Sequence, residues 1–179
     1  MDSLPKILQN LSRAQTLLLS SADTVPAQLW RACPGKDQWS AAELIAHLIA
    51  VEKNMIQKAD RIIQEAPRRI PYLQRWHLPL LLVESRLIKR KSPLPQFPEL
   101  LSEKEEMLAG LRAARERTLA FIEETRGRDL SVYCYWHPFL GMLNLYEWFQ
   151  MIAAHEIRHT KQMKEIAQRL PKVVASLQK

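Results

Sequence analysis

Four stretches of the chain place hydrophobic residues at every third or fourth position, which is the spacing of an α-helix with one apolar face. They cover residues 4–19, residues 40–66 up to Pro67, residues 102–127 and residues 144–171. No stretch alternates polar and apolar residues clearly enough to predict a β-strand. The pattern therefore predicts an all-α protein built as a four-helix bundle.

The expected helix ends follow from local capping signals. Ser40 and Glu43 form a Ser-x-x-Glu capping box at the start of the second helix, and Ser102 and Glu105 repeat it at the start of the third. Gly127 suits the end of the third helix, and proline follows the second and fourth. The expected core positions of the third helix are Leu108, Leu111, Leu119 and Ile122.

The segment between the second and third helices, residues 67–98, contains six prolines and cannot form one helix. At 179 residues the chain has the length of one domain. We therefore expect a single helical-bundle domain over residues 1–179, with residues 67–98 as an irregular linker inside it.

The positive charge of the chain lies in that linker. The 26 basic and 19 acidic residues give a net charge of +7, and residues 66–91 hold seven of the basic residues and one acidic residue. Tyr72 and Trp76 lie among them, and aromatic residues interleaved with basic ones can stack on nucleic-acid bases. A nucleic-acid-binding or DNA-damage-response protein is therefore the alternative function. A solvated basic surface is the commoner explanation, so nucleic acid is not an expected partner.

The remaining composition favours a cytoplasmic protein without a membrane partner. Two cysteines, Cys33 and Cys134, are too few for a disulfide framework. The longest apolar run is far shorter than the ~20 residues that cross a bilayer. Apolar residues left over on the helix faces make a homodimer compatible with the sequence.

Three histidines are expected to face the interior of the bundle. His155 and His159 are four residues apart on the apolar face of the fourth helix, and His47 lies on the apolar face of the second. Three imidazoles from facing helices can bind one divalent ion and leave coordination positions open, as in catalytic sites. From the residues alone, core histidines with separate hydrogen-bond partners remain the alternative.

The string from His155 to His159 also fits the H-E-x-x-H pattern of zinc proteases, in which Glu156 would be the general base. The fourth-helix context argues against a protease, because no further ligand motif and no strand for an extended peptide follow. Glu156 lies about 100° from His155 around the helix. A solvated or interhelical position is therefore expected for its carboxylate.

Other polar residues near the histidines have two interpretations each. Glu43, Glu52 and Glu147 could accept a hydrogen bond from a ligand histidine, although capping and surface positions are commoner. His137 precedes the fourth helix and could lie over the metal, although a loop hydrogen bond is commoner.

Two stretches resemble the DinB-like (YfiT-like) proteins: DQWSAAELIAHLIAVE, and HPFLGMLNLYEWFQMIAAHEIRHTKQM. The resemblance implies a four-helix bundle with a divalent metal, nickel or zinc, held by His47, His155 and His159. These are the same three histidines that the helical pattern selects.

The resemblance implies less about the reaction. The family includes thiol-dependent transferases and isomerases, metal-dependent hydrolases, and a founding member named for induction by DNA damage. We therefore expect a metal-dependent enzyme that activates a low-molecular-weight thiol or water toward a small-molecule substrate. No residue is assigned as the catalytic acid or base.

Overall fold

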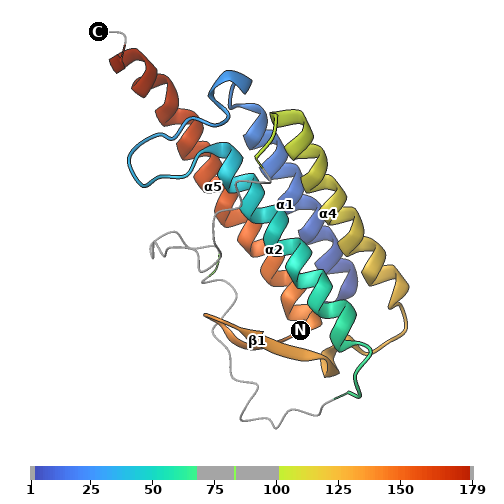
Figure 1. Cartoon of the computed structure of the whole chain (residues 1–179). Helices are drawn as coiled ribbons and strands as arrows, with labels where there is room; N and C mark the ends of the chain where they lie inside the picture. The colour runs from blue at the N-terminus through green and yellow to red at the C-terminus, as the bar shows by residue number, and fades with distance from the viewer. Residues whose placement is uncertain (1–2, 68–82, 84–100, 178–179) are drawn as a thin grey trace.

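The computed structural model of the chain describes residues 3–67, residue 83 and residues 101–177 (Figure 1). The basic residues between 68 and 91 and His77 lie outside the described residues, as does nearly all of the predicted linker. The segment behind the nucleic-acid-binding alternative thus lies outside the described residues.

Four long helices lie side by side in one bundle, which confirms the predicted all-α fold (Figure 1). They are α1 (Leu4–Asp23), α2 (Ala41–Ile62), α4 (Lys104–Glu124) and α5 (Leu145–Leu177). Helix α1 packs mainly against α5, and α2 packs against both α4 and α5. Short 3-10 turns occur at η1 (Ala27–Leu29) and η4 (Leu130–Val132). Among the helices described, none combines the length and hydropathy needed to cross a lipid bilayer.

A small antiparallel hairpin precedes α5 and was not predicted. Its strands are β1 (Cys134–His137) and β2 (Gly141–Asn144), and His137 pairs with Gly141 beside the three-residue connection. Gly141 has a φ of 95°, in the left-handed region that glycine adopts without strain. Four residues per strand are too few for a visible alternation, so the hydrophobic pattern did not predict the hairpin.

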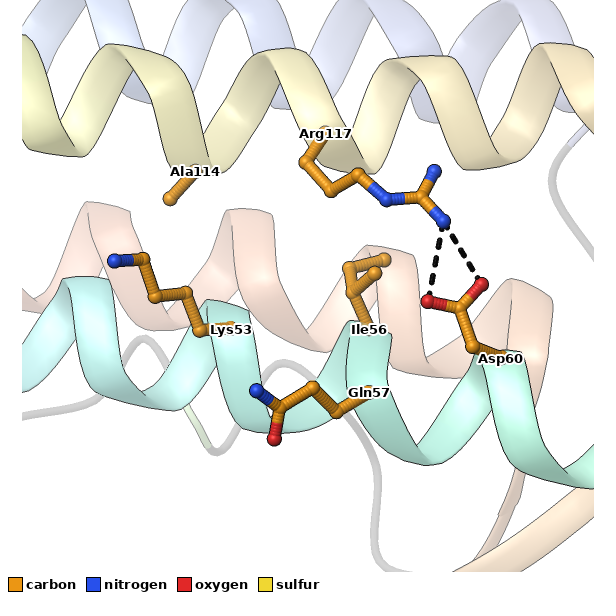
Figure 2. Close-up of a pocket in the computed structure, with 6 residues that line it drawn as sticks. All are labelled: Lys53, Ile56, Gln57, Asp60, Ala114 and Arg117. Atoms are coloured by element: carbon orange, nitrogen blue, oxygen red, sulfur yellow. Dashed lines mark hydrogen bonds and ion pairs between the residues drawn. The ribbon is translucent and has the colours of Figure 1, made fainter.

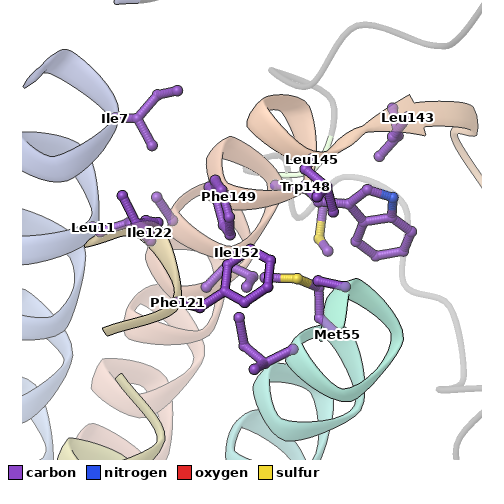
Figure 3. Close-up of a cluster of buried hydrophobic side chains, with 14 of the residues drawn as sticks. Ile7, Leu11, Met55, Phe121, Ile122, Leu143, Leu145, Trp148, Phe149 and Ile152 are labelled. Atoms are coloured by element: carbon purple, nitrogen blue, oxygen red, sulfur yellow. The ribbon is translucent and has the colours of Figure 1, made fainter. Parts of the chain in front are cut away.

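The buried hydrophobic side chains form two clusters along the bundle. The cluster at the hairpin end is drawn in Figure 3 and includes Ile7, Leu11, Met55, Phe121, Ile122, Leu143, Leu145, Trp148, Phe149 and Ile152. The second cluster includes Leu18, Trp30, Leu44, Leu48, Leu111, Met163, Ile166 and Leu170. On α5, His155 and His159 lie between the residues of the two clusters, and His47 of α2 lies beside Leu48 of the second cluster. A polar layer therefore crosses an otherwise apolar core.

Both predicted boundaries of the third helix need correction. Helix α4 is capped by Glu103 rather than Ser102, and no side-chain capping bond forms. Lys104 instead donates from Nζ to the carbonyl of Val25 at 2.8 Å, beyond the end of α1. The helix ends at Glu124, and Gly127 follows with a φ of 86° in the turn beyond it.

The last helix is longer than predicted. It begins at Leu145, as expected, but it continues through Pro171 to Leu177. Proline interrupts a helix because it lacks an N–H group and its ring crowds the preceding turn. Pro171 is exposed, so the ring meets solvent rather than a packed neighbouring helix. Because α5 continues past Pro171, the predicted stop at this proline is wrong.

The predicted capping box at the start of α2 is confirmed and gives a testable prediction. The Glu43 backbone N–H donates to Ser40 Oγ at 3.2 Å, and the Ser40 backbone N–H donates to the Glu43 carboxylate at 2.8 Å. Ser40→Ala should lower the free energy of unfolding by about 1 kcal/mol. Urea denaturation measures this loss, and Ser40→Thr, which keeps a hydroxyl to accept from the Glu43 N–H and to donate to its carboxylate, should recover most of it.

Candidate metal centre

The three predicted histidines lie together between α2 and α5. His47 comes from the second turn of α2, and His155 and His159 come from successive turns of α5. Their ring centroids are 4.5–5.2 Å apart. Of the described residues, these three form the group of possible ligands whose donor atoms all lie within 4.8 Å of one another.

The separations between the ring nitrogens suit one bound ion. His155 Nε2 lies 3.4 Å from His47 Nε2 and 3.1 Å from His159 Nε2. Tetrahedral coordination with bonds of about 2.0–2.1 Å places ligand nitrogens about 3.3 Å apart. The donor set therefore fits a divalent ion such as nickel or zinc, and it supplies three nitrogen ligands.

Gln162 fixes the orientation of one ring. Its Oε1 lies 3.0 Å from His159 Nδ1, one turn further along α5. Because Oε1 can only accept, Nδ1 carries the proton and Nε2 keeps its lone pair for a ligand bond. This contact was not predicted, although the i, i+3 spacing from His159 to Gln162 was a signal for it.

Burial keeps the three rings neutral. It lowers the pKa of His47 to about 4. Burial, with the neighbouring charges of His47 and Arg158, also holds the pKa of His155 well below its usual value. The pKa of His159 is likewise well below its usual value, through burial and then the neighbouring His155 and His47. Neutral imidazole is the form that binds a metal.

Trp39 forms an aromatic wall beside the cluster. Its ring is nearly parallel to that of His159, with centroids 6.2 Å apart and an interplanar angle of 5°. The same ring lies 4.9 Å from His47 at a tilted angle. Trp39 therefore limits the movement of one ligand from each helix.

The contact from Gln162 gives a second prediction. Gln162→Leu keeps the size of the side chain but removes the acceptor, so either nitrogen of His159 can then carry the proton. Removing such a partner typically weakens metal binding about 10–100-fold. Competition titration with a chelator measures this loss. Gln162→Glu, which keeps an acceptor at the same position, should retain tight binding.

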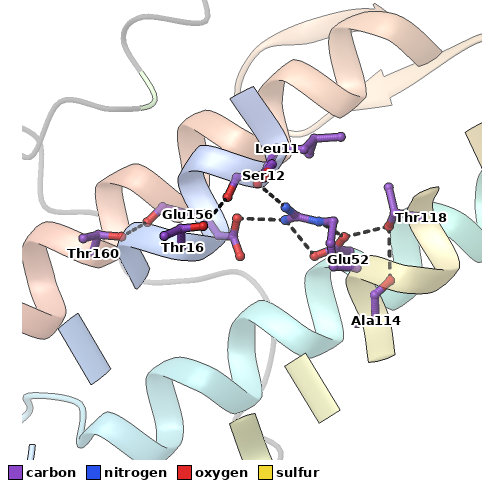
Figure 4. A network of polar contacts seen from close by, with 9 residues as sticks. Leu11, Ser12, Thr16, Glu52, Ala114, Thr118, Glu156 and Thr160 are labelled. Carbon is purple, nitrogen blue, oxygen red and sulfur yellow. Dashed lines mark hydrogen bonds and ion pairs between the residues drawn. The ribbon is translucent and has the colours of Figure 1, made fainter. Parts of the chain in front are cut away.

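A buried ionic network lies in the same polar layer and was not predicted (Figure 4). Arg115 donates from Nε to Glu52 at 2.7 Å and from Nη2 to Glu156 at 2.8 Å. It also donates to the Leu11 carbonyl at 2.6 Å, and Thr118 donates to Glu52 at 2.7 Å. Groups from all four long helices therefore meet at one guanidinium.

The network agrees with one expected alternative, and two other expectations need correction. Glu156 is 1% exposed, so its carboxylate takes the interhelical and not the solvated position. Glu52 binds Arg115 and Thr118 instead of orienting a histidine. Leu119 is exposed, while Arg115 is buried on the inner face of α4. Arg115 follows Leu111 by four residues, so both lie on the inner face of α4. A basic residue at such a position was the sequence signal for this network.

Burial and the neighbouring charges shift the pKa values within this network in opposite directions. Burial disfavours the charge of Arg115, but Glu52 and Glu156 hold its pKa above the usual value. Burial raises the pKa of Glu156 to about 7, although Arg115 acts in the opposite direction. Glu156 Oε1 is buried without a hydrogen-bond partner. Of the two carboxylates that bind Arg115, that of Glu156 therefore makes fewer hydrogen bonds than that of Glu52.

The remaining candidate residues have local roles. Glu43 closes the capping box of α2, and Glu147 accepts from the Asn144 backbone N–H at 2.8 Å at the start of α5. His137 accepts hydrogen bonds within the hairpin. Cys134 is half-buried and its thiol donates to the Ser131 carbonyl at 3.5 Å.

A separate pocket of about 140 Å³ lies between α2 and α4 (Figure 2). Its charged residues include Asp60 and Arg117, which form an ion pair at 2.9 Å. Lys53, at another edge, is an exposed side chain. Because the guanidinium in this pocket is already paired, the three-histidine cluster remains the stronger candidate for chemistry.

Known proteins are similar to this chain in sequence and in fold. The chain is 29% identical over 139 residues to the uncharacterized protein YuaE of Bacillus subtilis, covering 76% of this chain and 82% of the relative. Its fold is similar to the solved structure of YfiT from Bacillus subtilis, described as a probable metal-dependent hydrolase with an unusual four-helix bundle topology. That match has a TM-score of 0.64 and 14% identity, and covers 96% of this chain and 91% of the other.

The family assignment comes from the sequence profile. The DinB superfamily profile matches residues 10–163, a range that includes all three histidines, the hairpin and the polar layer. With its four-helix bundle and its three-histidine cluster, this chain belongs to the DinB superfamily.

Proposed function

We propose that the protein is a metal-dependent enzyme whose divalent ion, nickel or zinc, is held by His47, His155 and His159. The observation that carries this proposal is the convergence of three neutral ring nitrogens from two helices, with Nε2 separations of 3.1 and 3.4 Å. Three isolated core histidines would need separate partners, whereas here the nitrogens approach one another.

The chemistry of the proposed site follows from its donor set. A divalent ion with three protein ligands lowers the pKa of water or a thiol and supplies a nucleophile at neutral pH. Gln162 would hold the His159 ring in the ligating tautomer, and Trp39 would restrict the ring positions. We propose hydrolysis of, or transfer of a low-molecular-weight thiol to, a small electrophilic substrate. The description of YfiT as a probable metal-dependent hydrolase supports hydrolysis by fold-level analogy.

The geometry disfavours a zinc-protease mechanism despite the H-E-x-x-H string. In that mechanism the glutamate activates water next to the metal. Here Glu156 is buried and one of its oxygens accepts from Arg115 at 2.8 Å. A general base for the proposed reaction must therefore come from another group.

Metal analysis followed by activity screening tests the proposal. Purified protein should hold about one divalent ion per chain, and chelation should remove any hydrolase or thiol-transferase activity found with simple esters, amides or electrophiles. Nickel and zinc should each restore metal content after chelation. A chain that binds neither ion at micromolar concentration would refute the proposal.

A further inference from the structure

The hairpin is fixed to both helices that carry the histidine cluster. The Tyr135 hydroxyl donates to the Met55 carbonyl of α2 at 3.5 Å, and Trp148 of α5 donates from Nε1 to the Tyr135 carbonyl at 3.4 Å. The Tyr135 and Trp148 rings are also stacked, with centroids 4.2 Å apart. The end of β1 is therefore held over the line where α2 and α5 meet.

His137, the last residue of β1, lies on the same side of α5 as the cluster. Its ring centroid is 5.1 Å from that of Trp148. Trp148 precedes His155 by seven residues, so the two share a helix face and are about 10 Å apart along the axis.

The hairpin connection fixes the tautomer of His137. Its Nδ1 accepts from the backbone N–H groups of Phe139 and Leu140, both at 3.1 Å. A nitrogen that accepts carries no proton, so the proton of the neutral ring is on Nε2. Burial, with the positive charge of Lys58, lowers the pKa of His137 to about 4. At neutral pH the ring therefore offers an uncharged Nε2–H donor.

We propose that His137 is a substrate-binding residue whose Nε2–H donates to a carbonyl or carboxylate oxygen of the small molecule held at the three-histidine cluster. This inference rests on the proposed function and adds a second point of attachment to it. The ligand class is a small molecule with two oxygen-bearing groups, one at the metal and one some ångströms away. A fixed neutral donor needs no reorientation when the ligand binds.

Nδ1 of His137 binds the hairpin backbone, and Nε2 is the proposed donor to the ligand. Two substitutions can therefore distinguish the two roles. His137→Asn keeps an acceptor for the backbone N–H two residues later, because asparagine makes this contact in turns, but it removes the Nε2–H. His137→Gln places an amide nitrogen near the position of Nε2 and removes the Nδ1 acceptor. The asparagine variant should melt close to the wild type, and the glutamine variant should be the less stable.

The test uses the full chain loaded with Co²⁺ and followed by its visible spectrum. The probes are straight-chain dicarboxylates from succinate to suberate, each compared with the monocarboxylate of equal length. In the wild type, one dicarboxylate should bind roughly 3–10-fold more tightly than its monocarboxylate, after division by the statistical factor of about two for its two equivalent ends, as expected for one added hydrogen bond. The ratio should fall to about 1 in His137→Asn and persist in His137→Gln.

The outcomes separate this inference from the proposed function. An equal ratio in the wild type and His137→Asn, or a wild-type ratio of about 1 at every length, overturns the role of His137 and leaves the metal site intact. Failure of the chain to bind Co²⁺ overturns both proposals together.

Discussion

Arg115→Ala is expected to lower the free energy of unfolding by about 3–5 kcal/mol, the usual result of breaking a buried ion pair. Arg115, Glu52 and Glu156 are each at most 3% exposed. Removing the guanidinium leaves two carboxylates in the core without their cation, and it frees the Leu11 carbonyl and creates a cavity. Urea denaturation at neutral pH measures the change.

Arg117→Ala is the matched control for this prediction. Arg117 lies two residues further along α4 and binds Asp60 at 2.9 Å (Figure 2). It also binds Glu124 at 3.0 Å, but its side chain is 44% exposed. Exposed ion pairs contribute about 0–1 kcal/mol. Equal losses of unfolding free energy in the two variants would contradict the view that burial makes the Arg115 network important for stability.

His47→Ala is expected to have the largest effect on metal binding. It removes the ligand from α2 and leaves His155 and His159, a pair that cannot complete the three-nitrogen set. Loss of a residue that hydrogen-bonds to a ligand histidine weakens metal binding about 10–100-fold. Loss of a ligand itself should therefore weaken metal binding more than 100-fold. Titration with nickel and zinc, together with the metal content of purified protein, measures the effect.

Folding of the variant must be separated from metal loss. The metal-free His47→Ala protein should keep its helical circular dichroism, because the clusters on both sides of the polar layer are unchanged. His137→Asn, which removes an imidazole outside the three-histidine cluster, should retain about one ion per chain. Wild-type metal affinity in His47→Ala would show that the ion binds elsewhere.

The helical spacing predicted the bundle and the approach of the three histidines, because 3.6-residue periodicity places residues on a face. It predicted the start of α2 equally well, since Ser40 and Glu43 interact locally. That a metal binds the cluster remains a prediction.

The features that were missed depend on contacts between distant segments or on very short elements. Arg115 is buried through partners 63 and 41 residues away, which no periodicity reveals. The pattern therefore chose Leu119, a hydrophobic residue that is exposed. The hairpin has only four residues per strand, and its place beside Trp148 is a tertiary contact.

The distribution of the histidines along the chain has a consequence for folding order. His155 and His159 are one turn apart, so a nascent α5 brings them together without any other part of the protein. His47 is 108 residues from His155, so it arrives only after a long loop has closed and α2 has docked. We expect a divalent ion to leave the early folding rate almost unchanged and to slow unfolding, because the third ligand bond joins the two helices only in the native protein.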